Sequence, residues 1–186
     1  RARGLAVEGH GAGARPDALL AMLAAGVGSD HEPITAEEVL TRLRLGMYVY
    51  LRQGVTLQDL PALSRLWTEY DVPLDRVAFT TDGVDPAHAV AARCLNWVVG
   101  SAIAAGLPLV TAVRSATLVP ARRFGLDPWL GALTPHALAD VAVFDDERLE
   151  RPWRVLCEGT PPLVPGPSTL PAWLHEAALW LPTPRR

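Results

Sequence analysis

Short apolar runs alternate with longer amphipathic stretches over the first hundred residues of the chain. Runs of this length, bounded by glycine, proline and polar residues, are typical of buried strands, and we expect strands at 5–7, 27–28, 47–51 and 77–80. The run 47–51 is apolar at nearly every position and rich in strand-forming residues. It therefore predicts a strand that is covered on both faces, as strands of parallel sheets are.

Helix signals lie between these runs. Pro16 fits a first helical position and Gly26 a helix end, while Thr35 and Glu38 match a capping box. The hydrophobic pattern predicts a further helix at 59–70, and Asp85 is placed as the cap of a helix that continues to about residue 105. A chain that alternates strand and helix in this way predicts an α/β architecture with a parallel sheet.

After residue 108 the pattern changes. We expect short helices that are broken at Pro120, and then two strands at 139–144 and 153–157. The segment 159–167 is dense in proline and glycine, which predicts a loop, and 173–181 has the pattern of a short helix. The last third of the chain is therefore expected to lie outside the parallel sheet.

Composition narrows the classes of partner. The 186 residues are 49% hydrophobic and 20% charged, and the formal net charge of −3 gives no reason to expect nucleic acid or an anionic membrane as partner. The chain has no lysine, which excludes Schiff-base or carbamylated-lysine chemistry from within it. Gly106 and Pro108 interrupt the long uncharged stretch 94–113, which therefore predicts two buried helices and no membrane span. Cys94 and Cys157 lack metal-ligand spacing, and reduced thiols indicate a cytoplasmic protein.

Polar residues follow the predicted strands. His10 comes after the first strand, Asp30-His31-Glu32 after the second, and Asp82 after the fourth. Taken singly these residues have simpler interpretations, because Asp82-Gly83 favours a turn and a lone histidine usually makes a local hydrogen bond. Residues that follow parallel strands converge on one face, however, so two imidazoles and a carboxylate there predict a divalent-metal site. The carboxylates beside His31 are placed to orient its imidazole or to polarise a bound water.

Several motifs together resemble one group of enzymes. Gly9-His10, the stretch 29–32, the stretch 43–47 with 52–54, and Thr81-Asp82 occur in the order and spacing of adenine deaminases, which are metal-dependent members of the amidohydrolase superfamily. The stretches 115–121, 124–126, 131–133 and 139–143 are similar to the closing segment of that superfamily. The resemblance covers roughly residues 5 to 160.

The resemblance implies part of a TIM-type (β/α)8 barrel, with the four strands as the fifth to the eighth, followed by part of a small β-sandwich domain. The implied division is half of a metal-dependent hydrolase barrel at 1–125, β-sandwich strands at 126–160 and a proline-rich tail at 161–186. The implied activity converts adenine to hypoxanthine and ammonia. The cofactor is a divalent transition metal, with two ions of manganese, iron or zinc in the complete protein.

The same resemblance implies roles for single residues. His10, His31 and Asp82 match the metal ligands, and Asp82 also matches the base that takes a proton from the metal-activated water. Glu32 joins Asp82 as a candidate catalytic carboxylate. Arg52, which follows the third strand, and Asp30 are the candidates for contact with a purine substrate. Whether the protein forms a homo-oligomer is left open.

The chain also departs from the family pattern. The first four strands, with their paired histidines and bridging carboxylate, have no counterpart, and Gly83, Val84 and Asp85 stand where the family has a second aspartate and then arginine and histidine. The chain begins at Arg1 without a methionine, so we expect a piece of a longer protein that is inactive alone. Two alternatives remain: another amidohydrolase, either a different deaminase or a cyclic-amide hydrolase, and a non-catalytic remnant or partner subunit.

Overall fold

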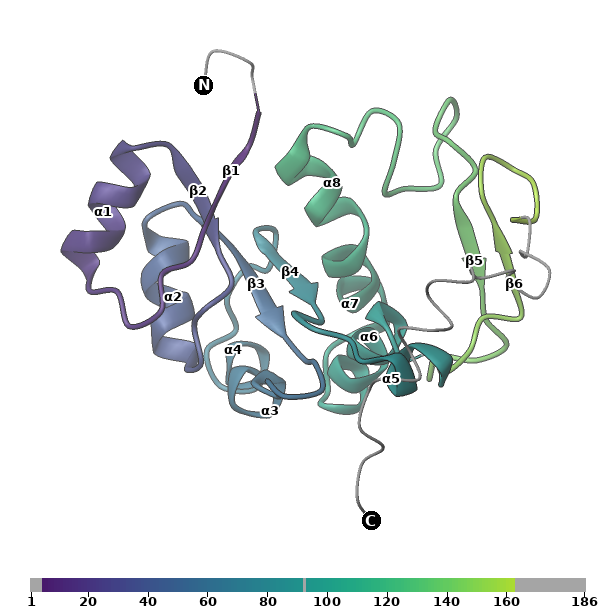
Figure 1. Ribbon diagram of the computed structural model, residues 1–186, viewed down its shortest axis with the longest axis horizontal. Coiled ribbons are helices and arrows are strands. Elements are labelled where there is room, and N and C mark those ends of the chain that lie inside the picture. The colour runs from purple at the N-terminus through teal and green to yellow at the C-terminus, as the bar shows by residue number, and fades with distance from the viewer. Residues whose placement is uncertain (1–4, 92, 163–186) are drawn as a thin grey trace, which may run out of the picture.

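A four-stranded parallel sheet organises the protein (Figure 1). The computed structural model describes residues 5–91 and 93–162. The strands β1 (Val7–Gly9), β2 (Val27–Asp30), β3 (Tyr48–Arg52) and β4 (Val77–Thr80) lie side by side in sequence order, and all three pairings are parallel. The prediction of an α/β architecture with a parallel sheet is therefore confirmed.

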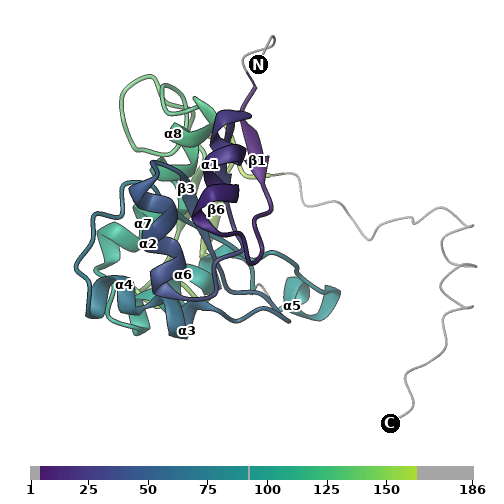
Figure 2. The same cartoon turned by 90° about the vertical axis from the view of Figure 1, so that its left-hand side faces the viewer.

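Helices connect and cover these strands. Between the strands lie α1 (Pro16–Ala24), α2 (Ala36–Arg44), and the short α3 (Leu60–Leu63) and α4 (Arg65–Thr68). After β4 come α5 (Pro86–Val90), α6 (Leu95–Ala104), α7 (Leu109–Ala116) and α8 (Leu118–Phe124). Helices α1 and α2 contact β2 and β3, whereas α6, α7 and α8 contact β4. Residues of α2, α6 and α7 join those of β3 and β4 in a single apolar core, so these helices cover the same face of the sheet (Figures 1 and 2).

Local capping explains where several helices begin. The Thr35 hydroxyl accepts a hydrogen bond from the Glu38 N–H, and the Glu38 carboxylate accepts one from the Thr35 N–H at 3.2 Å, which confirms the capping box. Asp85 caps α5 by accepting from the His88 N–H at 2.7 Å. Pro16 is the first residue of α1, where no N–H is needed.

Two long helices expected from the sequence are each divided in the structure. The segment 59–70 forms α3 and α4, separated at Ser64, whose hydroxyl donates to the Pro61 carbonyl. The segment 86–105 is interrupted between α5 and α6, where Asn96 accepts from the Cys94 N–H and donates to the carbonyl of Leu149. In both places a short polar side chain bonds to the backbone in competition with a continuous helix.

Three further boundaries differ from expectation. The first strand begins at Val7 and not at residue 5, and the second continues to Asp30. Ser29 and Asp30 are polar, yet they are fully buried and pair with β3, because their side chains find partners inside the protein. The helix break near Pro120 falls at Thr117, since Pro120 lies in the first turn of α8, where proline is tolerated.

The main core is formed by β3, β4 and the helices that cover them. Val49 and Leu51 of β3 are fully buried, as are the apolar side chains of the neighbouring elements, which include Val39, Leu60, Leu63, Leu66, Val77, Val98, Ala102 and Ala112. The prediction of a strand at 47–51 is confirmed to within one residue, but the two faces differ, because Val49 and Leu51 are buried whereas Tyr48 and Tyr50 on the opposite face are half-buried. Strand β1 is an edge strand, and its apolar side chain Val7 is exposed.

A second, two-stranded sheet lies apart from the first. The strands β5 (Val141–Val143) and β6 (Arg154–Leu156) pair antiparallel, within the two segments that the sequence predicts as strands. Helices α7 and α8 lie between this pair and the parallel sheet (Figure 1). The helix expected at 173–181 and most of the tail 161–186 lie outside the described residues, and the division of the chain at 125 and 160 stays a prediction.

Among the described helices, none combines the length and the apolar character that crossing a bilayer requires.

Candidate metal centre

Two histidines meet at the carboxyl end of the parallel sheet. His10 directly follows β1 and His31 directly follows β2. Because β1 and β2 are parallel neighbours, the residues that follow them lie at the same end of the sheet. The two imidazole ring centroids are 5.2 Å apart and the ring planes are inclined by 69°.

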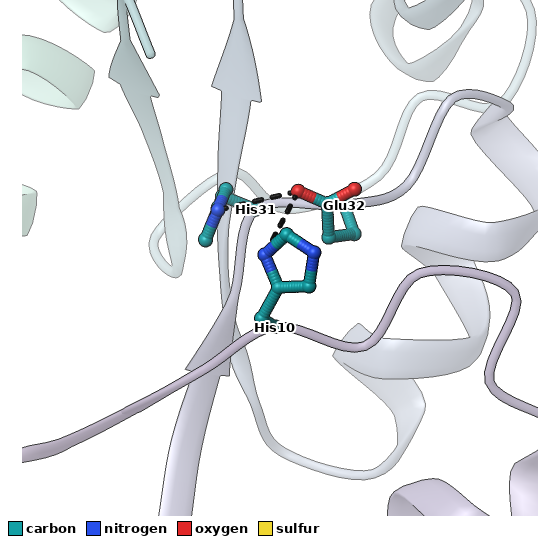
Figure 3. A group of neighbouring side chains, drawn as sticks. All are labelled: His10, His31 and Glu32. Atoms are coloured by element: carbon teal, nitrogen blue, oxygen red, sulfur yellow. Dashed lines mark ion pairs between the residues drawn. The ribbon is translucent and has the colours of Figure 1, made fainter.

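Glu32 completes a group of three ligand types (Figure 3). Its Oε1 atom lies 3.3 Å from His10 Nδ1 and 3.3 Å from His31 Nε2. One ligand atom from each of the three residues lies within 4.8 Å of the others. Ligands held about 2.0–2.2 Å from one ion lie roughly 3–4 Å from each other, so this donor set fits a divalent transition metal. The His10 side chain is 70% exposed, which leaves the group open to solvent on that side.

Arg52 joins this group to Asp82. It is the last residue of β3 and only 4% exposed. Its Nη1 atom lies 2.7 Å from Glu32 Oε1 and 3.4 Å from Asp82 Oδ2, while Nε donates to Asp59 at 2.9 Å. Burial alone would lower the pKa of the guanidinium, but the Asp59 and Glu32 carboxylates together hold that pKa above its ordinary value. The cation is therefore fixed among three carboxylates.

Asp82 reaches the same end of the sheet from β4. It follows the strand by two residues, with a left-handed φ of 42°, and its N–H donates to the Thr80 hydroxyl at 3.3 Å. Among the described residues, the group that could hold a metal ion consists of His10, His31 and Glu32, and Asp82 does not belong to it. Instead, Asp82 and His31 line one cavity of about 330 Å³ together with Tyr50, Phe79, Thr80, Pro120 and Phe124. That volume lies at the lower end of the range for small-molecule sites.

Asp30 makes different contacts from its neighbour His31, because successive side chains of a strand point to opposite faces. Its fully buried carboxylate accepts hydrogen bonds from the Gly11 N–H at 2.9 Å and from Arg42 Nε at 2.5 Å, and a longer one from the Glu32 N–H. Burial alone would raise the pKa of this carboxyl, but the Gly11 and Arg42 hydrogen bonds hold it below its ordinary value. Asp30 does not line the cavity of His31 and Asp82, and its contact with substrate stays a prediction.

Sequence reasoning missed two residues beside this group. Arg42 on α2 is 1% exposed. A signal for it exists, because residue 42 shares the helix face of Val39, which is buried. The Tyr50 hydroxyl is also buried, has no hydrogen-bond partner among the described residues, and has a pKa that burial raises above its ordinary value. Its signal is the strand period of two, which places it on the same face as Arg52.

Comparison with known proteins places the chain in a family. The model of the amidohydrolase family matches residues 1–168. The chain belongs to this family. Its members generally use divalent metal ions, in agreement with the donor set around Glu32.

Several curated relatives of this chain are adenine deaminases, which confirms the resemblance drawn from the motifs. The chain is 36% identical to the adenine deaminase of Desulforamulus reducens over 146 residues, which are 78% of this chain and 25% of that protein. It is 38% identical to that of Methanoregula boonei over 141 residues, 76% of this chain and 25% of that protein. The chain thus spans about a quarter of the length of these relatives.

Solved structures give the same fold at low sequence identity. N-acetylglucosamine-6-phosphate deacetylase from Pasteurella multocida superposes with a TM-score of 0.59 at 16% identity, covering 77% of this chain and 47% of that one. Molinate hydrolase superposes with a TM-score of 0.62 at 13% identity, covering 87% and 43%. The chain therefore shares the parallel α/β fold of these structures.

Proposed function

We propose that the group at the sheet end is part of the active site of an adenine deaminase, which hydrolyses adenine to hypoxanthine and ammonia. The observation that carries this proposal is the convergence of His10, His31 and Glu32 after two adjacent parallel strands, in a chain whose curated relatives bear that name. A purine base is the corresponding substrate.

The proposal includes a barrel. Strands β1 to β4 correspond to the fifth to the eighth strands of a (β/α)8 barrel, and β5 and β6 to part of a β-sandwich beside it. The match to amidohydrolase structures over less than half of their length supports this assignment. The remaining ligands of a two-ion centre then come from parts of the complete protein that this chain does not contain. This chain by itself is therefore expected to be inactive.

His10, His31 and Asp82 are the proposed ligands, for two ions of manganese, iron or zinc in the complete protein. An ion held by such residues would supply an activated water, since a bound divalent metal can lower the pKa of water from 15.7 to about 7. The two imidazoles offer nitrogen ligands from neighbouring strands, and Asp82 offers a carboxylate from the far side of Arg52. Imidazole and carboxylate ligands together suit all three metals.

The chain's own residues then handle protons and the base. Asp82 accepts one proton of the water that attacks the ring carbon bearing the amino group and passes it to the neighbouring ring nitrogen. As the C–N bond breaks and the carbonyl forms, Glu32 carries the second proton of that water from the new hydroxyl to the departing nitrogen, which leaves as ammonia. Arg52 holds Glu32 and Asp82 in place with Nη1 and donates to Asp59 with Nε, so a contact with the purine falls to its Nη2 atom. Tyr50 also lines the cavity.

The test is turnover of adenine by the intact gene product supplied with manganese, followed as ammonia release and hypoxanthine formation. His31→Ala should lower kcat/KM by more than the roughly 100-fold that loss of a residue supporting a metal ligand reaches. His136→Asn is the matched control, because His136 is exposed and lies far along the chain from the sheet end.

Other outcomes distinguish the alternatives. Turnover of another substrate from a panel of purines, pyrimidines and cyclic amides, without turnover of adenine, would indicate a different amidohydrolase. Absence of bound transition metal from the intact product would indicate a non-catalytic protein. Robust turnover of adenine by the 186-residue chain alone would contradict the requirement for further ligands.

A further inference from the structure

The position of His10 depends on its backbone. Its side chain is largely exposed, and its contacts in the structure are the one with Glu32 at 3.3 Å and the edge contact with the His31 ring. Neither contact fixes an exposed side chain on a loop. The residue that follows, Gly11, is by contrast buried.

Two buried charged side chains bind the backbone of Gly11. Its N–H donates to Asp30 Oδ1 at 2.9 Å, and its carbonyl accepts from Arg42 Nη2 at 2.8 Å. Asp30 and Arg42 also bind each other, with Arg42 Nε 2.5 Å from Asp30 Oδ2. The loop after β1 is thereby tied to β2, which carries Asp30, and to α2, which carries Arg42.

The same carboxylate also restrains the other side of the group. Asp30 Oδ1 accepts from the Glu32 N–H at 3.2 Å, so one side chain contacts the backbone beside His10 and the backbone of Glu32. Only a glycine fits at position 11, because a Cβ there would lie 2.7 Å from Asp30 Oδ2. The backbone of Gly11 does not have a left-handed φ, so this contact and not strain excludes a larger residue.

We propose that Asp30 and Arg42 are positioning residues, which hold the proposed ligand His10 and the carboxylate Glu32 beside His31 at the divalent-metal site. This inference rests on the proposed function, because it assumes that the three residues lie at the metal site. It gives Asp30 a role other than contact with the substrate, and it gives Arg42 a role that its place on a helix does not suggest. Ligands held in place before the ion arrives bind it more tightly, and partners behind a ligand typically contribute about 10–100-fold in affinity.

The test uses the intact gene product and two variants. Gly11→Ala leaves every charge in place and adds one methyl group against Asp30, whereas Asp30→Asn removes the charge but keeps an acceptor. Gly28→Ala is the matched control, because its added Cβ would meet the Arg123 guanidinium at 3.2 Å and not the Asp30 carboxylate. Hydrogen exchange of a peptide containing Gly11 in metal-free protein and manganese affinity by calorimetry are the two measurements.

We expect Gly11→Ala and Asp30→Asn to accelerate exchange at Gly11 by roughly tenfold or more in metal-free protein, and to weaken manganese binding by the folded protein by about 10–100-fold. Gly28→Ala should change neither quantity. Rapid exchange at Gly11 in the unaltered protein would overturn the proposal even if no metal binds, so its failure is distinguishable from failure of the deaminase assay. Unchanged manganese affinity in Gly11→Ala would also overturn it, because a residue needed only for stability leaves the affinity of the folded molecules intact. If Asp30→Asn does not fold, Gly11→Ala decides.

Discussion

The two buried arginines among the described residues, Arg42 and Arg52, differ in the charge that surrounds them. Arg42 contacts one carboxylate, that of Asp30, and the backbone carbonyls of Gly11 and Glu38. Arg52 contacts three carboxylates, those of Glu32, Asp59 and Asp82. The first arrangement is balanced, with one charge against one, whereas the second carries surplus negative charge beside two imidazoles.

This difference indicates a structural role for Arg42 and a place beside the metal site for Arg52. A balanced buried pair that also satisfies backbone groups fixes the positions of loops and offers nothing further to a ligand. Surplus carboxylates around one guanidinium remain attractive to a cation, and they lie at the sheet end where the family's site is expected. Two similar residues, only ten positions apart in the sequence, therefore have different proposed roles because of what surrounds them.

The largest expected effect comes from unbalancing the first pair. Arg42→Met leaves the Asp30 carboxylate buried without its cation, and loss of one partner of a buried pair costs about 3–5 kcal/mol in the free energy of unfolding. Urea denaturation of the metal-free protein measures this change. Arg65→Met, which removes exposed ion pairs with Glu37 and Glu69, is the control and should leave the midpoint unchanged. If Arg42→Met and the unaltered protein have the same urea midpoint, the Arg42–Asp30 pair does not stabilise the fold.

A smaller effect, of different character, is expected at the second arginine. Arg52→Gln leaves three carboxylates without their shared cation, which should destabilise the metal-free protein by about 1–3 kcal/mol. Manganese should then restore stability, because a ligand at 100 times its dissociation constant contributes about 2.7 kcal/mol. Thermal unfolding with and without manganese measures both effects. If manganese raises the Tm of Arg52→Gln by no more than it raises that of the unaltered protein, the carboxylates around Arg52 do not carry surplus negative charge.

The smallest effect is graded with pH. The pKa of Asp30 is held below its ordinary value in the folded protein, so this group contributes stability that is present above its unfolded pKa and is lost as the pH falls through its folded pKa. In Arg42→Met that folded pKa rises, and acid unfolding should begin at a higher pH. Free energies of unfolding measured between about pH 6 and pH 2 test this. If Arg42→Met and the unaltered protein unfold at the same pH, Arg42 does not lower the pKa of Asp30.

Much of the fold could be predicted because its signals are local. The capping box at Thr35 and the cap at Asp85 depend on residues three positions apart, and the apolar run at 47–51 carries its own burial pattern. The breaks at Ser64 and between α5 and α6 could not be predicted from periodicity. In the second of these, the side chain that binds the backbone also binds the carbonyl of Leu149, more than fifty residues away.

The sequence by itself determined that His10 and His31 each follow a strand, and that a carboxylate and an arginine follow the others, because strand ends and residue types are written locally along the chain. Only the tertiary structure decided which neighbours share a face. It directs His31 toward His10 and Glu32, and it buries Asp30 against Arg42 and Gly11. The physical reason is that the hydrogen bonds of Arg42 and Arg52 to Asp30, Gly11 and Glu32 join residues 12 to 31 positions apart. Their partners are set by strand order and burial, which no short stretch of sequence contains.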